Sequence, residues 1–385
     1  MSSMNIERAH TSGVYPKREL EIVRGLGARV WDAAGREYID CVTGHGVAVL
    51  GHCNPAVVRA IQAQAECLIT CPEVFYNDQR AAALSLLTRL APEGLTRAFL
   101  CNSGTEAIEA ALKFARLATG RPGFVAAMRG FHGRTLGALS ATWEPKYREP
   151  FLPLLPGFQH VPFDNLDKLR AAVTEDTAAV LLEVVQGEGG VRPCSPGYLS
   201  GAQEICRQKG ALLILDEVQT GCGRTGRMWA CQHHDVSPDL MCVGKGMAGG
   251  VPMGATLLGA RIPQLTQGAH GSTFGGNPLA AAATVAALSN IRDNDLPARA
   301  ARLGEWLLAR LREIPSQKIR EVRGLGLMIG IELREKVQPY LVALQDRQVL
   351  ALPAGPTVLR LLPPLVIEQD DLERVVEAIE GVLAA

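Results

Sequence analysis

The feature that most constrains the fold of this chain is the alternation of helical patterns with short apolar runs between about residues 51 and 290. The runs at 211–215 and 240–244 are examples, and polar or turn-forming residues follow each of them. Short apolar runs of this kind are typical of strands buried on both faces of a mostly parallel sheet. Helices must then cover both faces of that sheet. We therefore predict an α/β fold with a large, doubly wound, mostly parallel sheet.

The pattern changes at both ends of this region, and these changes give the expected domain boundaries. Residues 20–50 contain short strand-like stretches on either side of a turn at Gly35, as antiparallel strands do. After about residue 290, amphipathic helical periodicity alternates with strand-like segments. We expect a large domain at 51–290 and a smaller α+β domain at 291–385, to which the N-terminal segment 1–50 contributes.

Charge and composition argue against several classes of function. The chain has 385 residues, with 39 basic and 39 acidic side chains and 47% hydrophobic residues. Without a basic excess, neither nucleic acid nor a membrane surface is a favoured partner. The start of the chain is polar, and no apolar segment is long enough to span a membrane. The ten cysteines include no CxxC pair, and we therefore expect a reduced, cytoplasmic protein. Cysteines and histidines at 52–71 and 231–234 lack a zinc spacing, so we expect no metal.

Two ionisable residues stand where predicted strands end. Asp216 ends the apolar run at 211–215, and Lys245 follows the run at 240–244. Ligands of open α/β sheets bind beyond the carboxyl ends of the strands, so the carboxylate and the amine should reach the same edge. An aspartate facing a pyridinium nitrogen and a lysine that forms a Schiff base are what pyridoxal 5'-phosphate (PLP) requires. Each alone has a simpler explanation, a turn aspartate and a solvated lysine, and only the pair indicates PLP.

A phosphate site is predicted where an apolar strand leads into a helix through Asn102-Ser103-Gly104-Thr105-Glu106. This arrangement exposes backbone N–H groups at the positive end of a helix dipole. The alternative is a simple capping box, with Ser103 at the N-cap and Glu106 three residues later. The two are compatible, because N–H groups that the cap does not use stay free for phosphate. A glycine-rich loop at 270–277 could add a hydroxyl group.

Phe131 and Arg134 follow another predicted strand. The phenyl ring could stack on a pyridine ring, although a phenylalanine that packs in the core is the commoner case. The planar guanidinium of Arg134 suits a substrate carboxylate.

Several segments in their order along the chain resemble class III (subgroup II) PLP-dependent aminotransferases, and the resemblance covers residues 15–380. The chain is similar in particular to acetylornithine aminotransferases. It resembles more narrowly an aminotransferase of lysine biosynthesis that acts on aminoadipate semialdehyde held by the carrier protein LysW. The resemblance implies PLP-dependent transferase fold type I. The segments of the class are NSGTEA, GFHGRT, QGEGG, DEVQTGCGRTG, GKG, GSTFGGNPLA and LRLLPPLVI, and those of the narrower likeness are AALKFAR, TWEPKYREPFLPL, SQKIREVRGLGLMIGIEL and LALPAGPTVLRLLPPLVIE.

The resemblance also implies a role for each matching position. Lys245 would bind PLP covalently and move the proton, and Asp216 would keep the pyridine nitrogen protonated. Val218 and Phe131 would pack against the two faces of the ring. The other implied cofactor residues are Ser103, Gly104, Thr105, Glu217, Gln219 and, from a neighbouring subunit, Thr273, and the implied substrate residues include Arg134, Ser272 and Tyr15.

Glu188 and Arg360 are implied to form a switch between two unlike substrates. Glu188 would neutralise Arg360 in one half-reaction and open to admit a carboxylate in the other. Such a switch is physically sensible, because an unpaired buried charge costs several kcal/mol. A static salt bridge is the alternative. Val184 stands where proline is frequent in the family and should change the stiffness of this loop only slightly.

The leading expectation is a transaminase that takes an amino group from glutamate, releases 2-oxoglutarate and aminates a terminal aldehyde. The aldehyde would be carrier-linked aminoadipate semialdehyde or the glutamate semialdehyde analogue, with N-acetylornithine as the rival amine. A PLP-dependent aminomutase or decarboxylase and a nucleotide-binding or structural protein are more distant alternatives. The glycines between 324 and 330 do not open a helix as a dinucleotide loop would. We expect a homodimer, and basic residues at the mouth for an acidic carrier: Arg129, Lys146 and Arg148.

Overall fold

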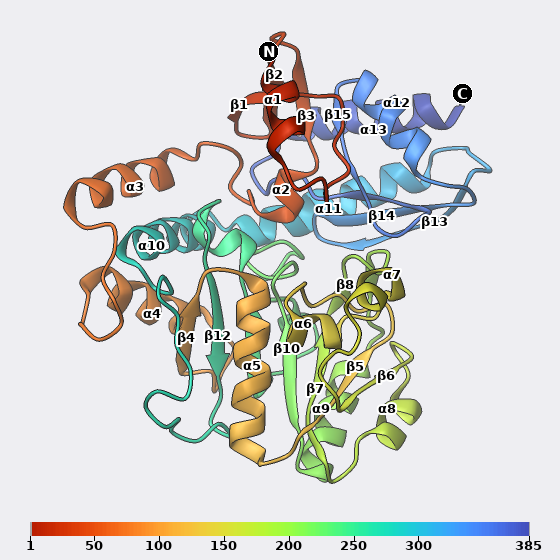
Figure 1. Cartoon of the computed structure of the whole chain (residues 1–385). Helices are drawn as coiled ribbons and strands as arrows, with labels where there is room; N and C mark the ends of the chain where they lie inside the picture. Colours follow the sequence, from red (N-terminus) through yellow and green to blue (C-terminus); the bar gives the residue numbers. More distant parts are fainter. Residues whose placement is uncertain (1, 385) are drawn as a thin grey trace.

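The computed structural model describes residues 2–384 and is built around one seven-stranded sheet (Figure 1). Its strands lie in the order β4 (Arg97–Cys101), β12 (Gly254–Leu258), β11 (Leu240–Val243), β10 (Leu212–Asp216), β7 (Thr177–Glu183), β5 (Gly123–Ala127) and β6 (Phe158–Val161). β12 runs antiparallel to both of its neighbours, β4 and β11, and every other adjacent pair in this sheet is parallel. Every residue of β7, β10 and β11 is buried, as their apolar sequences predict. The predicted mostly parallel sheet is confirmed.

Helices cover both faces of this sheet (Figure 1). Leu212 and Ile214 of β10 pack in the same core as α5, whereas Leu213 and Leu215 belong to the core on the opposite face. This alternation follows from the two-residue period of a strand. The helices of this part are α3 (Pro55–Cys67), α4 (Asp78–Leu90), α5 (Gly104–Thr119), α6 (Leu136–Ala141), α7 (Pro145–Arg148), α8 (Leu166–Ala172), α9 (Tyr198–Lys209) and α10 (Pro278–Asp293), with 3-10 turns η1 (Glu149–Phe151), η2 (Ala230–His233) and η3 (Lys245–Ala248).

Two four-stranded sheets lie with the C-terminal helices in the upper part of Figure 1. One has the order β13 (Ile319–Leu325), β14 (Met328–Leu333), β17 (Val358–Leu361) and β16 (Leu352–Pro353), and the other β1 (Ile22–Leu26), β2 (Arg29–Asp32), β3 (Glu37–Asp40) and β15 (Val349–Leu350). Because β15 pairs with β3, the two ends of the chain share a sheet, and on this basis we propose domain boundaries near residues 50 and 290. The remaining elements are α1 (Ser3–His10), α2 (Thr43–Gly46), α11 (Leu296–Arg312), α12 (Gln338–Asp346), α13 (Gln369–Ala384), β8 (Val185–Gln186) and β9 (Arg192–Pro193).

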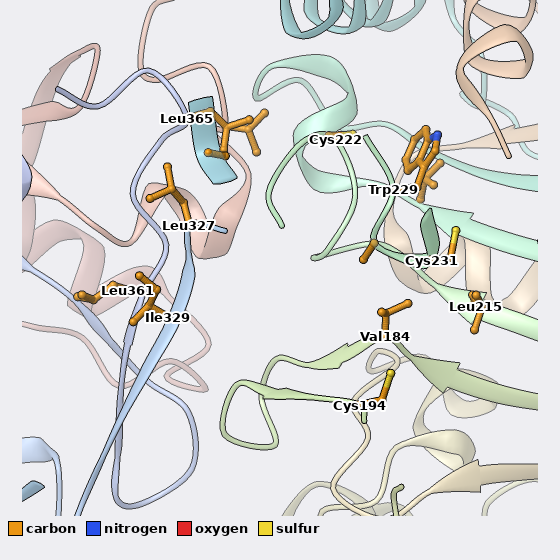
Figure 2. Close-up of a cluster of buried hydrophobic side chains, with 14 of the residues drawn as sticks. Val184, Cys194, Leu215, Cys222, Trp229, Cys231, Leu327, Ile329, Leu361 and Leu365 are labelled. Atoms are coloured by element: carbon orange, nitrogen blue, oxygen red, sulfur yellow. The ribbon is translucent and has the colours of Figure 1, made fainter. Parts of the chain in front are cut away.

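Buried apolar side chains run without a break from the large sheet to these smaller sheets. Figure 2 shows Leu215 and Trp229 on one side and Leu327, Ile329 and Leu361 on the other, and all five belong to one core. The Trp229 ring is fully buried, and its Nε1 donates a hydrogen bond to the Leu90 carbonyl at 2.6 Å. This packing fixes the loop that follows β10. Among residues 2–384, none of the helices combines the length and the apolar character that a membrane span needs.

Candidate active site

Asp216 and Lys245 meet at the carboxyl edge of the large sheet, as the sequence predicts for neighbouring parallel strands. Asp216 is the last residue of β10 and pairs with Cys242 of β11, three residues before Lys245. Lys245 has φ 46°, a left-handed conformation that is rare outside glycine and that functional sites often retain. Burial lowers the pKa of the Lys245 ammonium, while the carboxylates of Glu188 and Asp216 act against this effect.

Two contacts fix the Asp216 carboxylate. The Val218 N–H donates to its Oδ1 at 3.0 Å, and His132 Nδ1 lies 2.9 Å from its Oδ2. The His132 side chain is fully buried, and its backbone N–H donates to the Thr142 hydroxyl at 2.9 Å. His132 lies inside the GFHGRT segment, but no role for it was predicted from the sequence. Its partner is 84 residues away, so only the fold could reveal the contact.

Glu183 is a second acidic residue at this edge that the sequence analysis missed. It ends β7 and pairs with Asp216 across the sheet. Its two oxygens accept the N–H groups of Phe131 and Gly187, each at 3.0 Å. Burial, with the nearby charge of Asp216, raises the pKa of Glu183 to about 7, although His132 opposes the shift. Glu183 therefore joins the loop after β5 to the loop after β7 through one side chain.

The start of α5 forms a cradle of small residues. The predicted N-cap is present, because Ser103 accepts the Glu106 N–H, but the Glu106 carboxylate accepts the N–H of Asn102 at 2.8 Å instead of that of Ser103, so the reciprocal half of the predicted capping box is shifted by one residue. The first N–H groups of a helix have no carbonyl partners within the helix. Among those of α5, the Ser103 side chain accepts only the N–H of Glu106. A Cβ atom added to Gly104 would lie 2.5 Å from Val218 Cγ1, so only glycine fits here.

The neighbours of this cradle include further predicted residues. A Cβ atom on Gly244, just before Lys245, would lie 3.3 Å from the Gly104 backbone. The hydroxyl groups of Thr105 and Thr135 are 2.9 Å apart. The Ser272 hydroxyl accepts a hydrogen bond from the Asn102 side chain at 3.2 Å, which brings the loop at 270–277 next to the start of α5.

Glu188 and Arg360 form the ion pair that the resemblance implies. Arg360 Nη1 donates to Glu188 Oε1 at 2.6 Å and to Gln219 Oε1 at 3.2 Å. The Arg360 side chain is 1% exposed and that of Glu188 is 30% exposed. Burial alone would raise the pKa of Glu188, but the charge and hydrogen bond of Arg360 bring it below its usual value. Lys245 lies close enough to the pair for both charges to shift its pKa.

Arg134 lies on a small aromatic cluster. Its guanidinium carbon is 3.5 Å from the centre of the Tyr147 ring and 5.9 Å from that of Phe131. The two rings meet edge to face, with centres 6.1 Å apart. The Arg134 side chain is exposed and forms no ion pair with residues 2–384, so it is available for a carboxylate. Tyr147, which supports it, was not predicted.

Three of the predicted site residues either make contacts elsewhere in the fold or lie on the surface. Glu217 is buried, and its carboxylate accepts the Cys231 N–H at 2.7 Å and the Thr220 hydroxyl. Burial raises the pKa of Glu217, and its contacts support the loop after β10. Tyr15 is 74% exposed, and Thr273 is also exposed on the surface of this chain.

His45 lies at the same edge of the site and was not predicted. Thr43, Gly44 and His45 all have positive φ, a conformation that costs energy outside glycine. The Thr43 hydroxyl holds this turn by donating to the Leu362 carbonyl at 2.7 Å. Burial lowers the pKa of His45, and the charges of Glu188, Arg360 and Lys245 also act on it.

Comparisons with known proteins identify the family. The model of the family described as aminotransferase class-III matches residues 13–383. The chain belongs to the class III aminotransferases. It is 54% identical to the LysW-aminoadipate semialdehyde transaminase of Deinococcus radiodurans, over 98% of this chain and 89% of the relative. It is 48% identical to the acetylornithine aminotransferase of Methanopyrus kandleri, over 99% of this chain and 98% of the relative.

A solved structure agrees with this assignment. The ornithine aminotransferase of Toxoplasma gondii, whose active site is partially occupied by PLP, superposes with a TM-score of 0.95. It is 36% identical, and the match covers 99% of this chain and 93% of that one. The predicted class, PLP fold type I and the transaminase activity are therefore confirmed.

Class III aminotransferases depend on PLP, and the residues of this edge fit that group. Lys245, with its lowered pKa, suits the aldehyde of PLP, and the fixed Asp216 carboxylate suits the pyridine nitrogen. The start of α5, which has no side chain at Gly104, suits the phosphate. When bound, PLP withdraws electrons from a substrate C–H bond, so that the proton can be removed.

Proposed function

We propose that this aminotransferase moves an amino group from glutamate to a terminal aldehyde. The observation that carries the proposal is the Glu188–Arg360 pair, 2.6 Å apart, whose charges reach Lys245. A transaminase must accept two unlike substrates in one pocket, and a pair that can be closed or open offers each of them a different surface.

The pair is suited to this task by its unequal burial. Arg360 is almost fully buried and its Nε has no hydrogen-bond partner among residues 2–384, whereas Glu188 is partly exposed. Removing one partner from a buried pair typically costs about 3–5 kcal/mol. Glu188 must therefore stay until a substrate carboxylate replaces it. A substrate with a terminal amine and no carboxylate at that end would bind with the pair closed.

Lys245 and Asp216 would carry out the main chemical roles. Since burial lowers its pKa, Lys245 releases its proton more readily than a surface lysine and can move a proton at the substrate carbon. Asp216, held by His132 and Val218, would keep a proton on the pyridine nitrogen. Arg134 would bind the substrate carboxylate, with Ser272 and Tyr15 near the mouth. The remaining residues proposed to hold the cofactor are Ser103, Gly104, Thr105, Phe131, Val218, Gln219 and, from a second copy of the chain, Thr273.

The proposed aldehyde is aminoadipate semialdehyde linked to a carrier protein such as LysW. Its support is the 54% identity with the Deinococcus transaminase that is named for this substrate. The glutamate semialdehyde analogue is a related substrate of the same type. N-acetylornithine is the second candidate, because the Methanopyrus acetylornithine aminotransferase is 48% identical.

Basic residues near Arg134 would favour an acidic carrier. Lys146 is exposed, with its Nζ 4.8 Å from the Tyr147 ring on which Arg134 also lies. Arg129 is exposed, and its carbonyl would be 2.5 Å from a Cβ atom on Gly189, next to Glu188. Arg148 is only partly exposed and contributes less to such a surface. Raising the salt concentration should then slow the carrier reaction more than that of a small amine.

A homodimer is proposed as the active unit. Thr273 and Phe274 are exposed, close to an exposed apolar loop that includes Val74 and Phe75. Arg80 joins the two segments, since it donates to the carbonyls of Phe75 at 2.8 Å and Gly276 at 3.0 Å. A second copy of the chain that covers this surface would receive Thr273 near its phosphate site. The molar mass of the cofactor-loaded enzyme in solution should be that of at least two chains.

The decisive experiment compares kinetics with the carrier-linked amine and with N-acetylornithine, using 2-oxoglutarate as acceptor. We expect the higher kcat/KM with the carrier-linked amine. No measurable rate with that substrate would refute the narrower proposal and favour acetylornithine. Turnover that does not require 2-oxoglutarate would instead indicate an aminomutase or a decarboxylase.

A further inference from the structure

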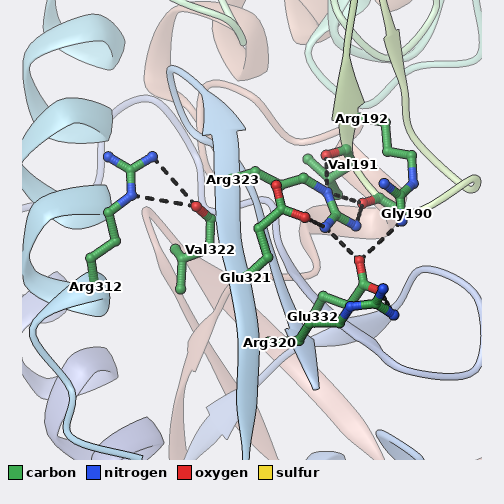
Figure 3. A network of polar contacts seen from close by, with 9 residues as sticks. All are labelled: Gly190, Val191, Arg192, Arg312, Arg320, Glu321, Val322, Arg323 and Glu332. Carbon is green, nitrogen blue, oxygen red and sulfur yellow. Dashed lines mark hydrogen bonds and ion pairs between the residues drawn. The ribbon is translucent and has the colours of Figure 1, made fainter. Parts of the chain in front are cut away.

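The loop that carries Glu188 is held by an arginine of the neighbouring sheet. Figure 3 shows the Arg323 guanidinium of β13 against the backbone of Gly190 and Val191. Arg323 Nε donates to both carbonyl oxygens at 3.0 Å, and Nη2 donates to the Gly190 oxygen at 2.5 Å. The Arg323 side chain is 9% exposed, so water cannot easily replace these bonds.

Glu332 of β14 fixes this guanidinium in turn (Figure 3). Its Oε2 accepts hydrogen bonds from Arg323 Nη1 at 2.5 Å and from Arg192 Nη2 at 3.0 Å, and its Oε1 accepts one from Arg320 at 3.3 Å. Burial alone would raise the pKa of Glu332, but Arg323 and the other two arginines hold it below its usual value. The carboxylate therefore stays charged and joins the far end of the Glu188 loop to β14.

The register of the sheet places Arg323 and Arg360 on either side of Gly330. Gly330 pairs with Arg323 of β13 and with Arg360 of β17. Directly paired residues of antiparallel strands project to the same face, so both arginines flank the space above Gly330. Val191 fills this space, because a Cβ atom on Gly330 would lie only 2.8 Å from the Val191 Cβ. The loop thus crosses the sheet between two arginines. Arg323 donates to the loop backbone, and Arg360 donates to the Glu188 side chain.

The other end of the loop is also fixed. The Gly187 N–H donates to the Glu183 carboxylate at 3.0 Å, and the Gln186 side chain donates to the Met128 carbonyl at 2.9 Å. With the backbone held on both sides, the partly exposed side chain of Glu188 is the part that is free to rotate.

We propose that Arg323 is a positioning residue that keeps Glu188 in register with Arg360 by holding the loop backbone. This inference rests on the proposed switch role of that pair. The pair then opens by rotation of the Glu188 side chain while the loop stays in place. A lysine could not replace Arg323, since a single ammonium cannot bind two carbonyls and a carboxylate with the geometry of a planar guanidinium.

The test measures the two half-reactions separately, in single turnovers of the PLP-loaded enzyme with N-acetylornithine and with glutamate. Without the hydrogen bonds from Arg323 to the loop backbone, Glu188 is paired with Arg360 for a smaller fraction of the time. This lowers the rate with the substrate that binds while the pair is closed. Arg323→Gln should lower the specificity constant for N-acetylornithine roughly tenfold and that for glutamate less than about threefold, on the scale of a lost charged hydrogen bond.

Arg312→Gln is the matched control. Arg312 lies at the end of α11 and donates to the Val322 carbonyl of the same strand β13 at 3.4 Å, on the side away from the Glu188 loop (Figure 3). The control should leave the ratio of the two specificity constants unchanged. Equal losses in both half-reactions of Arg323→Gln would mean that Arg323 only supports the fold, and would overturn the proposal.

Glu188→Ala separates this inference from the proposed switch. If it leaves the ratio unchanged, the switch itself is wrong. If Glu188→Ala lowers the specificity constant for N-acetylornithine relative to that for glutamate while Arg323→Gln does not, only the positioning role is refuted. In the Glu188→Ala background, Arg323→Gln should have no further effect on the ratio, and a further selective loss there would also contradict the proposal.

A second variant covers the case in which Arg323→Gln does not fold. Glu332→Gln leaves the contacts between Arg323 and the loop but removes the charge of the buried one of the two carboxylates, Glu332 and Glu321, that hold the guanidinium. It should show a smaller selective loss with N-acetylornithine, about threefold, as for a weakened rather than a lost hydrogen bond. An unchanged ratio in a folded Glu332→Gln enzyme would overturn the proposal.

Discussion

His132→Phe should slow catalysis without a comparable loss of stability. The His132 ring lies 2.9 Å from the Asp216 carboxylate, and the two side chains are 0% and 7% exposed, so water cannot replace the contact. A hydrogen bond to a charged group is worth about 1.5–3 kcal/mol. At about 1.4 kcal/mol for each factor of ten, kcat/KM should fall by about tenfold to a hundredfold, because Asp216 is held less firmly.

The free energy of unfolding of this variant should fall by less than the bond alone is worth, because the cost of leaving the buried Asp216 oxygen without a partner is partly offset. His132 Nε2 is buried and has no hydrogen-bond partner among residues 2–384, so a phenyl ring removes an unsatisfied polar atom as well as a bond. His132→Asn is the control, since its amide could still donate to Asp216 and should retain more activity. Steady-state kinetics and thermal unfolding of the loaded enzyme measure both effects. A His132→Phe enzyme within twofold of the wild-type rate would refute the reasoning.

Two further perturbations follow from the same edge of the sheet. Gly104→Ala should weaken PLP binding at least tenfold, as expected if about 1.4 kcal/mol or more is lost, because the new Cβ would lie 2.5 Å from Val218 Cγ1. Spectroscopic titration of the apoenzyme with PLP measures this, and unchanged affinity would contradict the cradle. Glu183 has its pKa raised from 4.5 to about 7 in the folded protein, so folding favours its protonated form. The wild type should therefore lose stability relative to Glu183→Gln as pH rises from about 4.5 to 7. Denaturation at several pH values measures this, and a difference in the free energy of unfolding that stays constant across that range would contradict the raised pKa of Glu183.

The strands that carry the site could be predicted because their sequences report burial directly. The strands β10 and β11 are apolar throughout since they are covered on both faces, and the residues after them must lie at one edge. The same reasoning gave the helix from Gly104, whose cap is encoded within four residues. Neither α1 nor the short β8–β9 pair was predicted, because such segments are too short for a periodic signal.

The parts of the site that the sequence analysis missed depend on distant partners. His132 and Asp216 are 84 residues apart, and Arg323 reaches Gly190 across 133 residues. Polarity at a strand end also does not fix the direction of a side chain. Glu217 follows Asp216 directly, yet its carboxylate binds the Cys231 backbone. Local patterns gave the edge at which chemistry takes place, and only the packed fold gave the second layer of contacts.

The central claim is that Lys245 is the residue that binds PLP. The direct measurement is the mass of the peptides obtained after the loaded enzyme is reduced with borohydride and digested. We predict that the peptide containing Lys245 carries the added mass of the reduced cofactor, and that Lys245→Ala protein carries none. Cofactor mass on a different lysine, or its retention in the Lys245→Ala protein, would contradict the account.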